Sequence, residues 1–371
     1  MNDITIDKTG WKKWRFDEVC REVNTSSKEP VADGVDHVIG LEHIEPGNLH
    51  ITKWDTLEKE TTFTRKFVKG QVLFGRRRAY QRKVAYAEFD GICSGDILVF
   101  EAIEENLLPE LLPFLIQSDG FFEKALATSA GSLSPRTKFK ELADYEFLLP
   151  PKSEQKRLAE LLWAADEMIE KEKRELEKVK HLRELRFENI TSQIANAKLA
   201  DCLIVLKSKS KAPHLYDKYI GLEHIESGAF TTNIFGDPKN VLADSFIFKQ
   251  GDLLYSKLRP YLDKCIIADF DGISTTELIV YDTTPIVSKE YILHVLHSKR
   301  FLDYIVDKSF GTKMPRVSHE IVSEYELYVP SPEKQEAILK EINAFVSQEI
   351  NIAKQISYSR QLKQKLINKI F

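Results

Sequence analysis

The sequence predicts an α+β fold made by tandem duplication. Each copy joins a mixed α/β domain to a long helix, and we expect the two helices to pair as an antiparallel coiled coil. Two observations lead to this prediction. The seven-residue string IGLEHIE occurs at residues 39–45 and again at residues 220–226. After each mixed region, a proline-containing turn leads into a long segment dense in Glu, Lys, Arg and aliphatic residues.

The repeat extends over most of the 371 residues. Four further pairs of segments align at the same spacing, with a slip of one residue between the second and third pairs. They are GQVLF (70–74) with GDLLY (251–255), FDGI (89–92) with FDGI (270–273), GSLSPR (131–136) with GTKMPR (311–316), and PPKSEQ (150–155) with PSPEKQ (330–335). Such a spacing is far longer than the ~20–50 residues of solenoid repeats. The chain therefore contains two copies of one domain-sized fold, which we expect to form pseudo-symmetric halves.

Each half divides into a mixed domain and a helix. We expect the mixed domains at residues 1–150 and 197–330, because these regions are rich in β-branched and aromatic residues, Gly and turn signals. In the first domain, GQVLFG and GICSGDILVF are predicted to form strands, and residues 114–126 a short helix.

The long helices are expected at residues 151–196 and 331–371. Residues 152–196 contain no Pro or Gly, and their apolar positions are spaced mainly by threes and fours, which is the coiled-coil pattern. A helix of ~45 residues is about 65–70 Å long at ~1.5 Å per residue, too long to pack fully against its own domain. Its apolar stripe therefore favours pairing with the other long helix, antiparallel if a two-fold axis relates the halves. Two unrelated surface helices are the alternative.

Composition and charge exclude several classes of protein. Hydrophobic residues make up 43% of the chain and charged residues 30%, which excludes wholesale disorder. A net charge of −4 excludes a uniformly basic nucleic-acid binder, although a local basic patch is compatible with it. The four cysteines form no CxxC pair, which argues against a zinc site or a disulfide framework. Because no apolar run approaches the ~20 residues of a membrane span and no signal peptide is evident, we expect a cytoplasmic protein without membrane contact.

Familiar catalytic motifs are missing. The sequence has no Walker A motif, no GxGxxG, no GxSxG and no HExxH, and its Pro150-Pro151 pair lacks the flanking residues of an amino-methyltransferase motif. The best catalytic or metal-binding candidates are Glu42, His43 and Glu45, with their copies Glu223, His224 and Glu226. We favour a structural position at a strand end for them, because no third ligand or nucleophile recurs at a fixed place in both halves.

A basic cluster follows a predicted strand in each half. Residues 65–83 carry eight Lys or Arg and no acidic residue. Arg can read guanine or grip phosphate, Tyr can stack, and Gln can pair with adenine. The pattern favours a DNA-contacting loop over the alternative, a solvated basic turn. The candidates are Arg76, Arg77, Arg78, Tyr80, Gln81, Arg82 and Lys83 in the first half, and Lys257, Arg259, Tyr261 and Lys264 in the second.

A second candidate loop combines Gly with hydroxyl groups and a cation, which suits phosphate positioning. Its Arg comes at the start of a following strand, so a structural role is an equal alternative. The candidates are Ser132, Arg136 and Lys138 in the first half, and Thr312, Lys313 and Arg316 in the second.

Taken together, these motifs resemble the specificity (S) subunit of type I restriction–modification enzymes. The resemblance rests on the doubled IGLEHIE and FDGI strings, on GDLLYSKLRPY with its looser copy GQVLFGRRRAY, and on the helix entries PPKSEQKRLAELL and PSPEKQEAILKEI. It covers essentially the whole chain, and the Pro…Glu-Gln helix entry placed twice is specific. One departure is Asp263, which stands where the first half has Arg82.

The resemblance implies two target-recognition domains for double-stranded DNA, joined by spacer helices that dock two methylation (M) subunits. It implies no catalytic site in this chain: S-adenosylmethionine binds the M subunits, and ATP and Mg²⁺ serve the restriction (R) subunits. The complex would read a bipartite site with a non-specific gap. Two rival hypotheses stay open, namely a DNA adenine methyltransferase or nuclease with unrecognised motifs, and a coiled-coil scaffold that does not bind DNA.

Overall fold

The computed structural model describes residues 6–27, 29–30, 32, 34–57, 61–131 and 134–371. The chain forms two compact units. One comprises Met1–Lys173 with Lys354–Phe371, and the other comprises Arg174–Ala353. Each unit therefore takes in one mixed domain and a piece of both long helices. In the part of the chain described here, no helix combines the length and apolar character needed to span a membrane.

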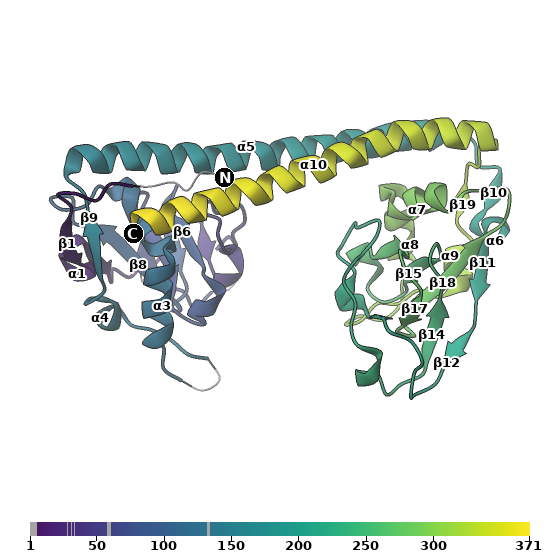
Figure 1. The fold of residues 1–371 in the computed structure, drawn as a ribbon, viewed down its shortest axis with the longest axis horizontal. Coiled ribbons are helices and arrows are strands. Elements are labelled where there is room, and N and C mark those ends of the chain that lie inside the picture. The colour runs from purple at the N-terminus through teal and green to yellow at the C-terminus, as the bar shows by residue number, and fades with distance from the viewer. Residues whose placement is uncertain (1–5, 28, 31, 33, 58–60, 132–133) are drawn as a thin grey trace. The chain divides into compact units, whose positions relative to one another are not determined.

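The first unit contains two sheets and a short strand pair (Figure 1). One sheet is antiparallel, in the order β2-β8-β5-β6; in the other, β7 pairs in parallel with β3 and antiparallel with β4. The strands are β1 (Lys12–Arg15), β2 (Cys20–Val23), β3 (Val38–Ile39), β4 (Arg65–Phe67), β5 (Val72–Gly75), β6 (Val84–Tyr86), β7 (Gly91–Cys93), β8 (Ile97–Ala102) and β9 (Glu146–Leu149). The helices are α1 (Phe16–Val19), η1 (Leu41–His43), η2 (Ala79–Gln81), η3 (Pro109–Leu111), α2 (Leu112–Gln117), α3 (Asp119–Ala127), α4 (Phe139–Leu142) and α5 (Lys152–Thr191).

The second unit repeats this arrangement, with an additional strand in its second sheet. The sheet orders are β11-β18-β15-β16 and β12-β14-β17-β13, and β10 pairs with β19. The strands are β10 (Ala197–Lys198), β11 (Leu203–Leu206), β12 (Lys209–Ser210), β13 (Tyr219–Ile220), β14 (Ser245–Phe248), β15 (Leu253–Ser256), β16 (Cys265–Ile267), β17 (Gly272–Ser274), β18 (Leu278–Thr283) and β19 (Glu326–Leu327). The helices are α6 (Leu199–Cys202), η4 (Leu222–His224), η5 (Pro238–Asn240), η6 (Pro260–Leu262), α7 (Lys289–His297), α8 (Lys299–Asp307), α9 (His319–Ser323) and α10 (Pro332–Ile370).

The central strands are apolar on both faces because both faces are covered. On β5, Val72 and Phe74 belong to the core with the helices, whereas Leu73 belongs to the core with the smaller sheet. This alternation follows from the two-residue period of a strand. The predicted strand in GQVLFG is confirmed as β5, and GICSGDILVF contains two strands, β7 and β8.

The predicted helix at residues 114–126 is wrong as a single element. The chain forms α2 and α3, which meet at Ser118. Ser118 has extended backbone angles, and its hydroxyl accepts a hydrogen bond from the Phe121 N–H at 3.3 Å. A serine in this position caps a new helix and satisfies one of its free N–H groups, so it favours a helix start over continuation.

A glutamine anchors the start of each long helix. The Gln155 side chain accepts a hydrogen bond from the Leu108 N–H at 2.9 Å and donates to the Asn106 and Pro150 carbonyls, both at 3.0 Å. Gln335 makes the corresponding three bonds in the second unit, to Ser288, Ile286 and Pro330. The glutamine shared by the two helix entries therefore has a physical cause: a buried amide joins the helix to its domain.

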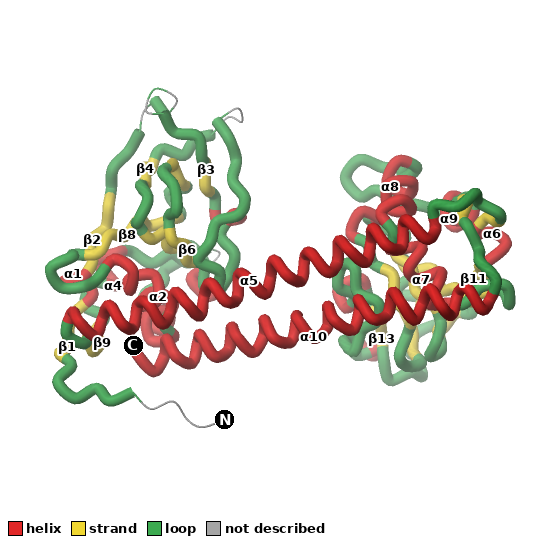
Figure 2. The backbone as a smooth tube through the Cα atoms, turned by 90° about the horizontal axis from the view of Figure 1, so that it is seen from above, coloured by secondary structure: helices red, strands yellow, loops and turns green. Residues whose placement is uncertain are grey.

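Within each unit, α5 and α10 lie side by side and antiparallel (Figure 2). In the first unit, Asp166 pairs with Lys363 and Glu172 accepts a hydrogen bond from Ser359. In the second, Arg183 binds Glu349 at 2.6 Å and Arg186 binds Glu341 at 2.6 Å. In both units, residues further along α5 contact residues that come earlier in α10. This order is the one that antiparallel helices produce, as predicted.

The first long helix is shorter than residues 151–196. It ends at Thr191, and residues 192–196 lead into β10. Asn196 holds this extended segment, because its side chain donates to the Val329 carbonyl at 3.0 Å and accepts from the Val329 N–H at 2.8 Å. These bonds to a neighbouring segment replace the helical bonds that the local sequence alone would favour.

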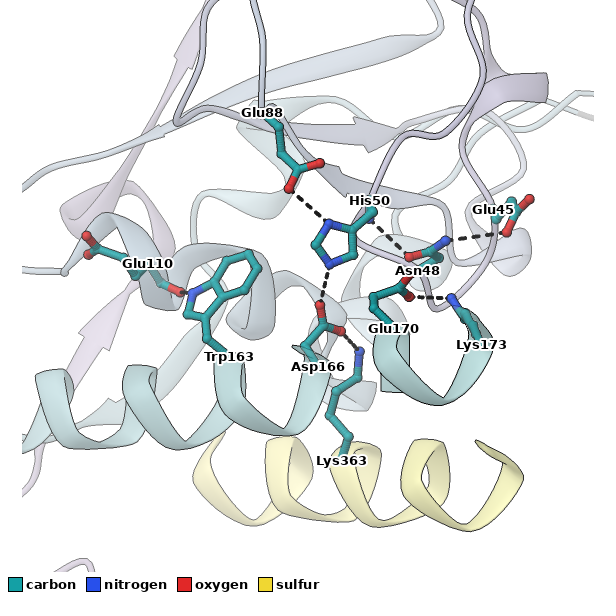
Figure 3. A network of polar contacts seen from close by, with 10 residues as sticks. All are labelled: Glu45, Asn48, His50, Glu88, Glu110, Trp163, Asp166, Glu170, Lys173 and Lys363. Atoms are coloured by element: carbon teal, nitrogen blue, oxygen red, sulfur yellow. Dashed lines mark hydrogen bonds and ion pairs between the residues drawn. The ribbon is translucent and has the colours of Figure 1, made fainter. Parts of the chain in front are cut away.

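A buried polar network ties the first mixed domain to both helices (Figure 3). His50 Nε2 lies 2.8 Å from Asp166 Oδ2, and His50 Nδ1 lies 3.0 Å from Glu88 Oε1. The second oxygen of Asp166 accepts from Lys363 Nζ at 2.5 Å, and both side chains of this pair are almost fully buried. The hydrogen bond to Asp166 raises the pKa of His50 to about 8, against the opposing effect of burial.

This network predicts a pH-dependent stability of the first unit. Because the folded pKa of His50 lies above the unfolded value of 6.5, its contribution is fully present below pH 6.5 and is lost as the pH rises through about 8. A shift of this size corresponds to about 2 kcal/mol at most, and solvent screening of the half-buried imidazole reduces it to about 1 kcal/mol. We expect the free energy lost in His50→Gln to be larger at pH 6 than at pH 9 by about 1 kcal/mol.

Tryptophan fluorescence measures this unit selectively, because all four tryptophans, Trp11, Trp14, Trp54 and Trp163, lie within it. Urea unfolding of the full chain and of His50→Gln at both pH values gives the comparison. An equal loss of stability at pH 6 and pH 9 would contradict the charged role of His50.

Candidate nucleic-acid interface

The basic cluster of the first half forms a tight turn between β5 and β6. The short helix η2 lies in its centre, flanked by Arg78 at φ 54° and Arg82 at φ 52°. Left-handed backbone is uncommon for residues other than Gly, and it often marks positions held for function. The Arg78 N–H is fixed by a 2.9 Å hydrogen bond to the Pro135 carbonyl. The turn therefore presents Arg78 from a constrained backbone.

The second half builds the same turn between β15 and β16. Arg259 and Asp263 flank η6 at φ 51° and φ 48°, and the Arg259 N–H donates to the Pro315 carbonyl at 2.7 Å. The two turns thus share backbone geometry although several of their side chains differ. We call these segments, residues 76–83 and 257–264, the basic turns.

The fold brings the two predicted loops of each half together. In the first unit, Arg77 and Arg136 form an isolated β-bridge, and the Thr137 N–H donates to the Arg76 carbonyl at 3.1 Å. In the second, Leu258 bridges Arg316 in the same way. Segments about 60 residues apart along the chain therefore form one surface in each unit.

In the first half, a carboxylate holds the two loops to one another. Asp96 accepts from Arg136 Nε at 2.7 Å and from Arg77 at 3.2 Å, and Arg77 also donates to Ser134 at 3.0 Å. Burial alone raises the pKa of Asp96, but the hydrogen bonds from Arg136 and Arg77 outweigh it and lower that pKa below its ordinary value. Glu277 takes the same place in the second unit and accepts from Arg316 at 3.3 Å.

Sequence reasoning missed Asp96 and Glu277. A signal for them exists, because both residues occupy the same position of the repeat and both are acidic. No local pattern indicates that they contact the basic turns, because the contact depends on how the chain crosses between the sheets.

Several predicted DNA-contacting residues are engaged by the fold. Lys83 Nζ donates to the Leu41 carbonyl at 2.6 Å, and Lys264 Nζ donates to the corresponding Leu222 carbonyl at 2.7 Å. Arg82 donates to the Gln117 carbonyl at 3.2 Å, pairs with Asp119 and stacks over the Phe122 ring. These contacts give the three side chains a role in holding the turns in place.

Other predicted residues face outward. Tyr80 and Tyr261 are 57% and 52% exposed. Among the described residues, no hydrogen bond or ion pair occupies the guanidinium of Arg78 or Arg259. Arg76, Gln81 and Lys257 are half-buried, whereas Lys138, Thr312 and Lys313 are exposed. Ser132 lies outside the described residues.

The Glu-His-Glu strings have a structural role. His43 Nδ1 accepts a hydrogen bond from the Gly40 N–H at 3.0 Å, and His224 does the same with Gly221 at 2.9 Å. Each histidine thus caps the short helix that follows a strand, which agrees with the predicted structural position at a strand end. Glu42, His43 and Asp55 come close enough to share a cation, but Gly236 replaces Asp55 in the second unit.

Comparison with known proteins places the chain in a family. The sequence profile described as "Type I restriction modification DNA specificity domain" matches residues 8–181 and again residues 209–359. The chain belongs to this family. The type I specificity chain is 23% identical over 330 residues to the EcoDI specificity subunit of Escherichia coli, covering 73% of each protein.

Solved structures share the fold of the specificity chain. A chain from a type I R-M system, solved in work on complex assembly and conformational transition, has a TM-score of 0.57 at 17% identity. The alignment covers 98% of this chain and 97% of that one. The S subunit from M. genitalium gives a TM-score of 0.53 at 15% identity, over 100% and 98% of the two chains. The duplicated architecture predicted from the sequence is therefore a known fold.

The carboxylate contact predicts a local change in dynamics. Asp96→Asn removes the charge that holds Arg77 and Arg136, which we expect to weaken the partly exposed contact by about 1 kcal/mol. The amides of Ala130 and Arg136, which bond to each other's carbonyls, should then exchange with solvent roughly fivefold faster.

Glu277→Gln is the matched control, because it should accelerate exchange in the segment from Phe310 to Arg316 and leave the first unit unchanged. Hydrogen exchange followed by mass spectrometry of the full chain gives both measurements. Unchanged exchange at residues 130–136 in Asp96→Asn would show that the carboxylate does not hold the loop.

Proposed function

We propose that this chain is the DNA-recognition subunit of a type I restriction–modification complex, that it reads a bipartite, asymmetric site, and that it has no catalytic activity of its own. The observation that carries the proposal is the pair of basic turns. Each turn sets an arginine in left-handed backbone beside an exposed tyrosine, and each is bridged to a second loop whose arginine pairs with a carboxylate.

Arg78 and Arg259 are the proposed base readers. Arginine contacts guanine O6 and N7 in the major groove, and each such contact is worth about 1–3 kcal/mol of discrimination. Their guanidinium groups remain available, while the backbone that carries them is fixed by hydrogen bonds to Pro135 and Pro315. A constrained backbone reduces the entropy lost when the side chain binds. Tyr80 and Tyr261 are positioned to stack or to donate to phosphate.

The two half-sites should differ because the turns differ. Arg77, Gln81 and Arg82 of the first turn correspond to Leu258, Leu262 and Asp263 of the second. These substitutions change the donors and acceptors near the major groove. The proposed site is therefore asymmetric, with one sequence for each unit.

The proposed partners are double-stranded DNA, two M subunits and the R subunits. In this proposal S-adenosylmethionine binds the M subunits, ATP and Mg²⁺ serve the R subunits, and the complex works in the cytoplasm of a prokaryote. Exposed apolar residues on the helices of the first unit support a protein-docking surface there. They are Leu161, Met168, Tyr358 and Leu362.

The acidic net charge is compatible with this function. Phosphate contacts supply most of the affinity of a DNA-binding protein, and base contacts supply its specificity. The chain concentrates cations at the basic turns, although its net charge is −4. M subunits would add basic surface around the DNA.

Arginine substitutions should separate the half-sites. We expect Arg78→Ala to relax or abolish recognition of the first half-site only, and Arg259→Ala that of the second only. Each variant is the control for the other. Methylome sequencing of cells carrying the chain with its M subunit shows which half-site is affected.

Binding measurements extend this test. If both arginine variants bind DNA with unchanged affinity, salt dependence and sequence preference, the basic turns are not the reading elements. A wild-type methylome with a perfectly palindromic site would contradict the asymmetry. Methylation or cleavage by the isolated chain would favour the enzyme alternative instead.

We further propose that the long helices set the gap between the half-sites. Adding one heptad to both α5 and α10 keeps their apolar seam in register and lengthens each by ~10 Å. That is about three base pairs at the ~3.4 Å rise of B-DNA. Methylome sequencing should show the same half-sites with a longer gap. A gap of unchanged length would show that the helices are not the spacer.

A further inference from the structure

A group of aromatic rings lies at one end of the smaller sheet in the first unit. The His37 ring stacks on Phe89 with centroids 4.1 Å apart, and the Trp54 ring lies 4.8 Å from His37 and 5.4 Å from Phe89. Trp54 is 44% exposed. These rings do not belong to the basic turn, and the proposed DNA contacts do not use them.

The second unit has a group of the same kind. Phe235 and Phe270 pack edge to face at 5.5 Å, and Lys218 Nζ lies 4.9 Å and 4.3 Å from their ring centroids. Phe235 is 46% exposed. We call the two groups, His37 with Trp54 and Phe89, and Lys218 with Phe235 and Phe270, the aromatic rims.

Backbone hydrogen bonds show that the rims are equivalent. Val38 and Asp55, the residues that follow His37 and Trp54, exchange two N–H···O bonds. Tyr219 and Gly236, which follow Lys218 and Phe235, do the same. In addition, the His37 carbonyl accepts from the Ile92 N–H, and the Lys218 carbonyl accepts from the Ile273 N–H, each at 3.0 Å. The same three positions of the fold therefore build each rim.

The rims persist in a segment that has otherwise diverged. Between residues 46–64 and 227–245, which align at the offset of the repeat, Gly47 and Gly228 are the sole identical pair. The aromatic character of Trp54 and Phe235 is kept nevertheless, although each residue is nearly half exposed to solvent. If Trp54 and Phe235 served only to cover Phe89 and Phe270, fuller burial of their own side chains would stabilise the fold more. The gain would be ~25 cal/mol per Å² of apolar surface buried.

We propose that each aromatic rim binds the sugar–phosphate backbone of double-stranded DNA beside the half-site read by the basic turn of the same unit. This inference rests on the proposed function. The exposed ring offers an apolar face to deoxyribose, and Lys218 offers a cation to phosphate while remaining over two rings. In the second unit, this pairing of a cation with an open aromatic ring matches nucleic acid better than an apolar protein surface.

The position of the rim is consistent with one duplex contacting both elements. Phe89 lies just before β7 in the chain, and Asp96 lies just after it. Asp96 is the residue that holds the basic turn through Arg77. Seven residues of chain span at most about 25 Å, which corresponds to about seven base pairs at ~3.4 Å each. Because backbone contacts position a protein without reading sequence, the rim should add affinity to every DNA.

The test uses the full chain assembled with its M subunits and two duplexes, one with the methylated target and one without it. We expect Trp54→Leu and Phe235→Leu each to weaken binding about tenfold to both duplexes, with the target preference unchanged. Lys218→Gln should lower the slope of log affinity against log salt by about 1, the value for one phosphate. Circular dichroism melting verifies that each variant is folded.

Two controls match these variants. Trp54→Phe should bind like the wild type, because the second unit already uses Phe at this position. Lys299→Gln removes an exposed lysine of α8 that pairs with Asp303, and it should leave the salt slope unchanged. Lys218→Gln is a mild change, so it keeps the test decisive if the leucine variants unfold.

The outcomes separate the rim from the proposed function. If the wild-type complex does not prefer its target, both the proposed function and the proposed DNA contact of the rim are contradicted. If the wild type binds and the rim variants bind equally well with the same salt slope, the rim alone is refuted. A variant that changes the preferred sequence, or that fails to assemble with the M subunits, also overturns a backbone contact.

Discussion

The contact between α5 and α10 is the constraint on which both units depend. In the first unit α5 supplies the acid, Asp166, and α10 the base, Lys363, whereas in the second α5 supplies Arg183 and α10 supplies Glu349. A shift of one helix along the other would bury these charges without partners, which is costly even when the intact pair adds little net stability. The pairs therefore fix the register of the helices more than they stabilise them.

The duplication separates what the fold requires from what recognition can vary. Both units keep the glutamine anchors, the histidine caps, the lysine bonds to a carbonyl and the left-handed residues of the turns. These contacts set the backbone of the basic turns. The side chains at the tips differ, so one scaffold presents two different surfaces.

The distribution of charge shows why a count of basic residues is a poor guide to a binding site. Of the cations in the first basic turn, Arg82 and Lys83 are engaged by Asp119 and by carbonyl groups, and Arg77 is held by Asp96. Arg78 lies in left-handed backbone, and in the described part of the chain no hydrogen bond or ion pair occupies its guanidinium. Carboxylates within reach of a basic cluster decide which of its charges face a ligand.

The sequence by itself determined the duplication, the fold class, the two long helices and the family, because these depend on repeats and periodicities that are visible in one dimension. It also located the basic turns. It could not show that Ser118 divides a helix or that Thr191 ends one, because capping and strand contacts override helix propensity there. The tertiary structure alone decided that Asp96 joins two loops about 60 residues apart, that Lys83 serves the fold, and that Trp54 meets His37 and Phe89. Such contacts depend on how the strands are arranged in three dimensions, and no local sequence pattern specifies that arrangement.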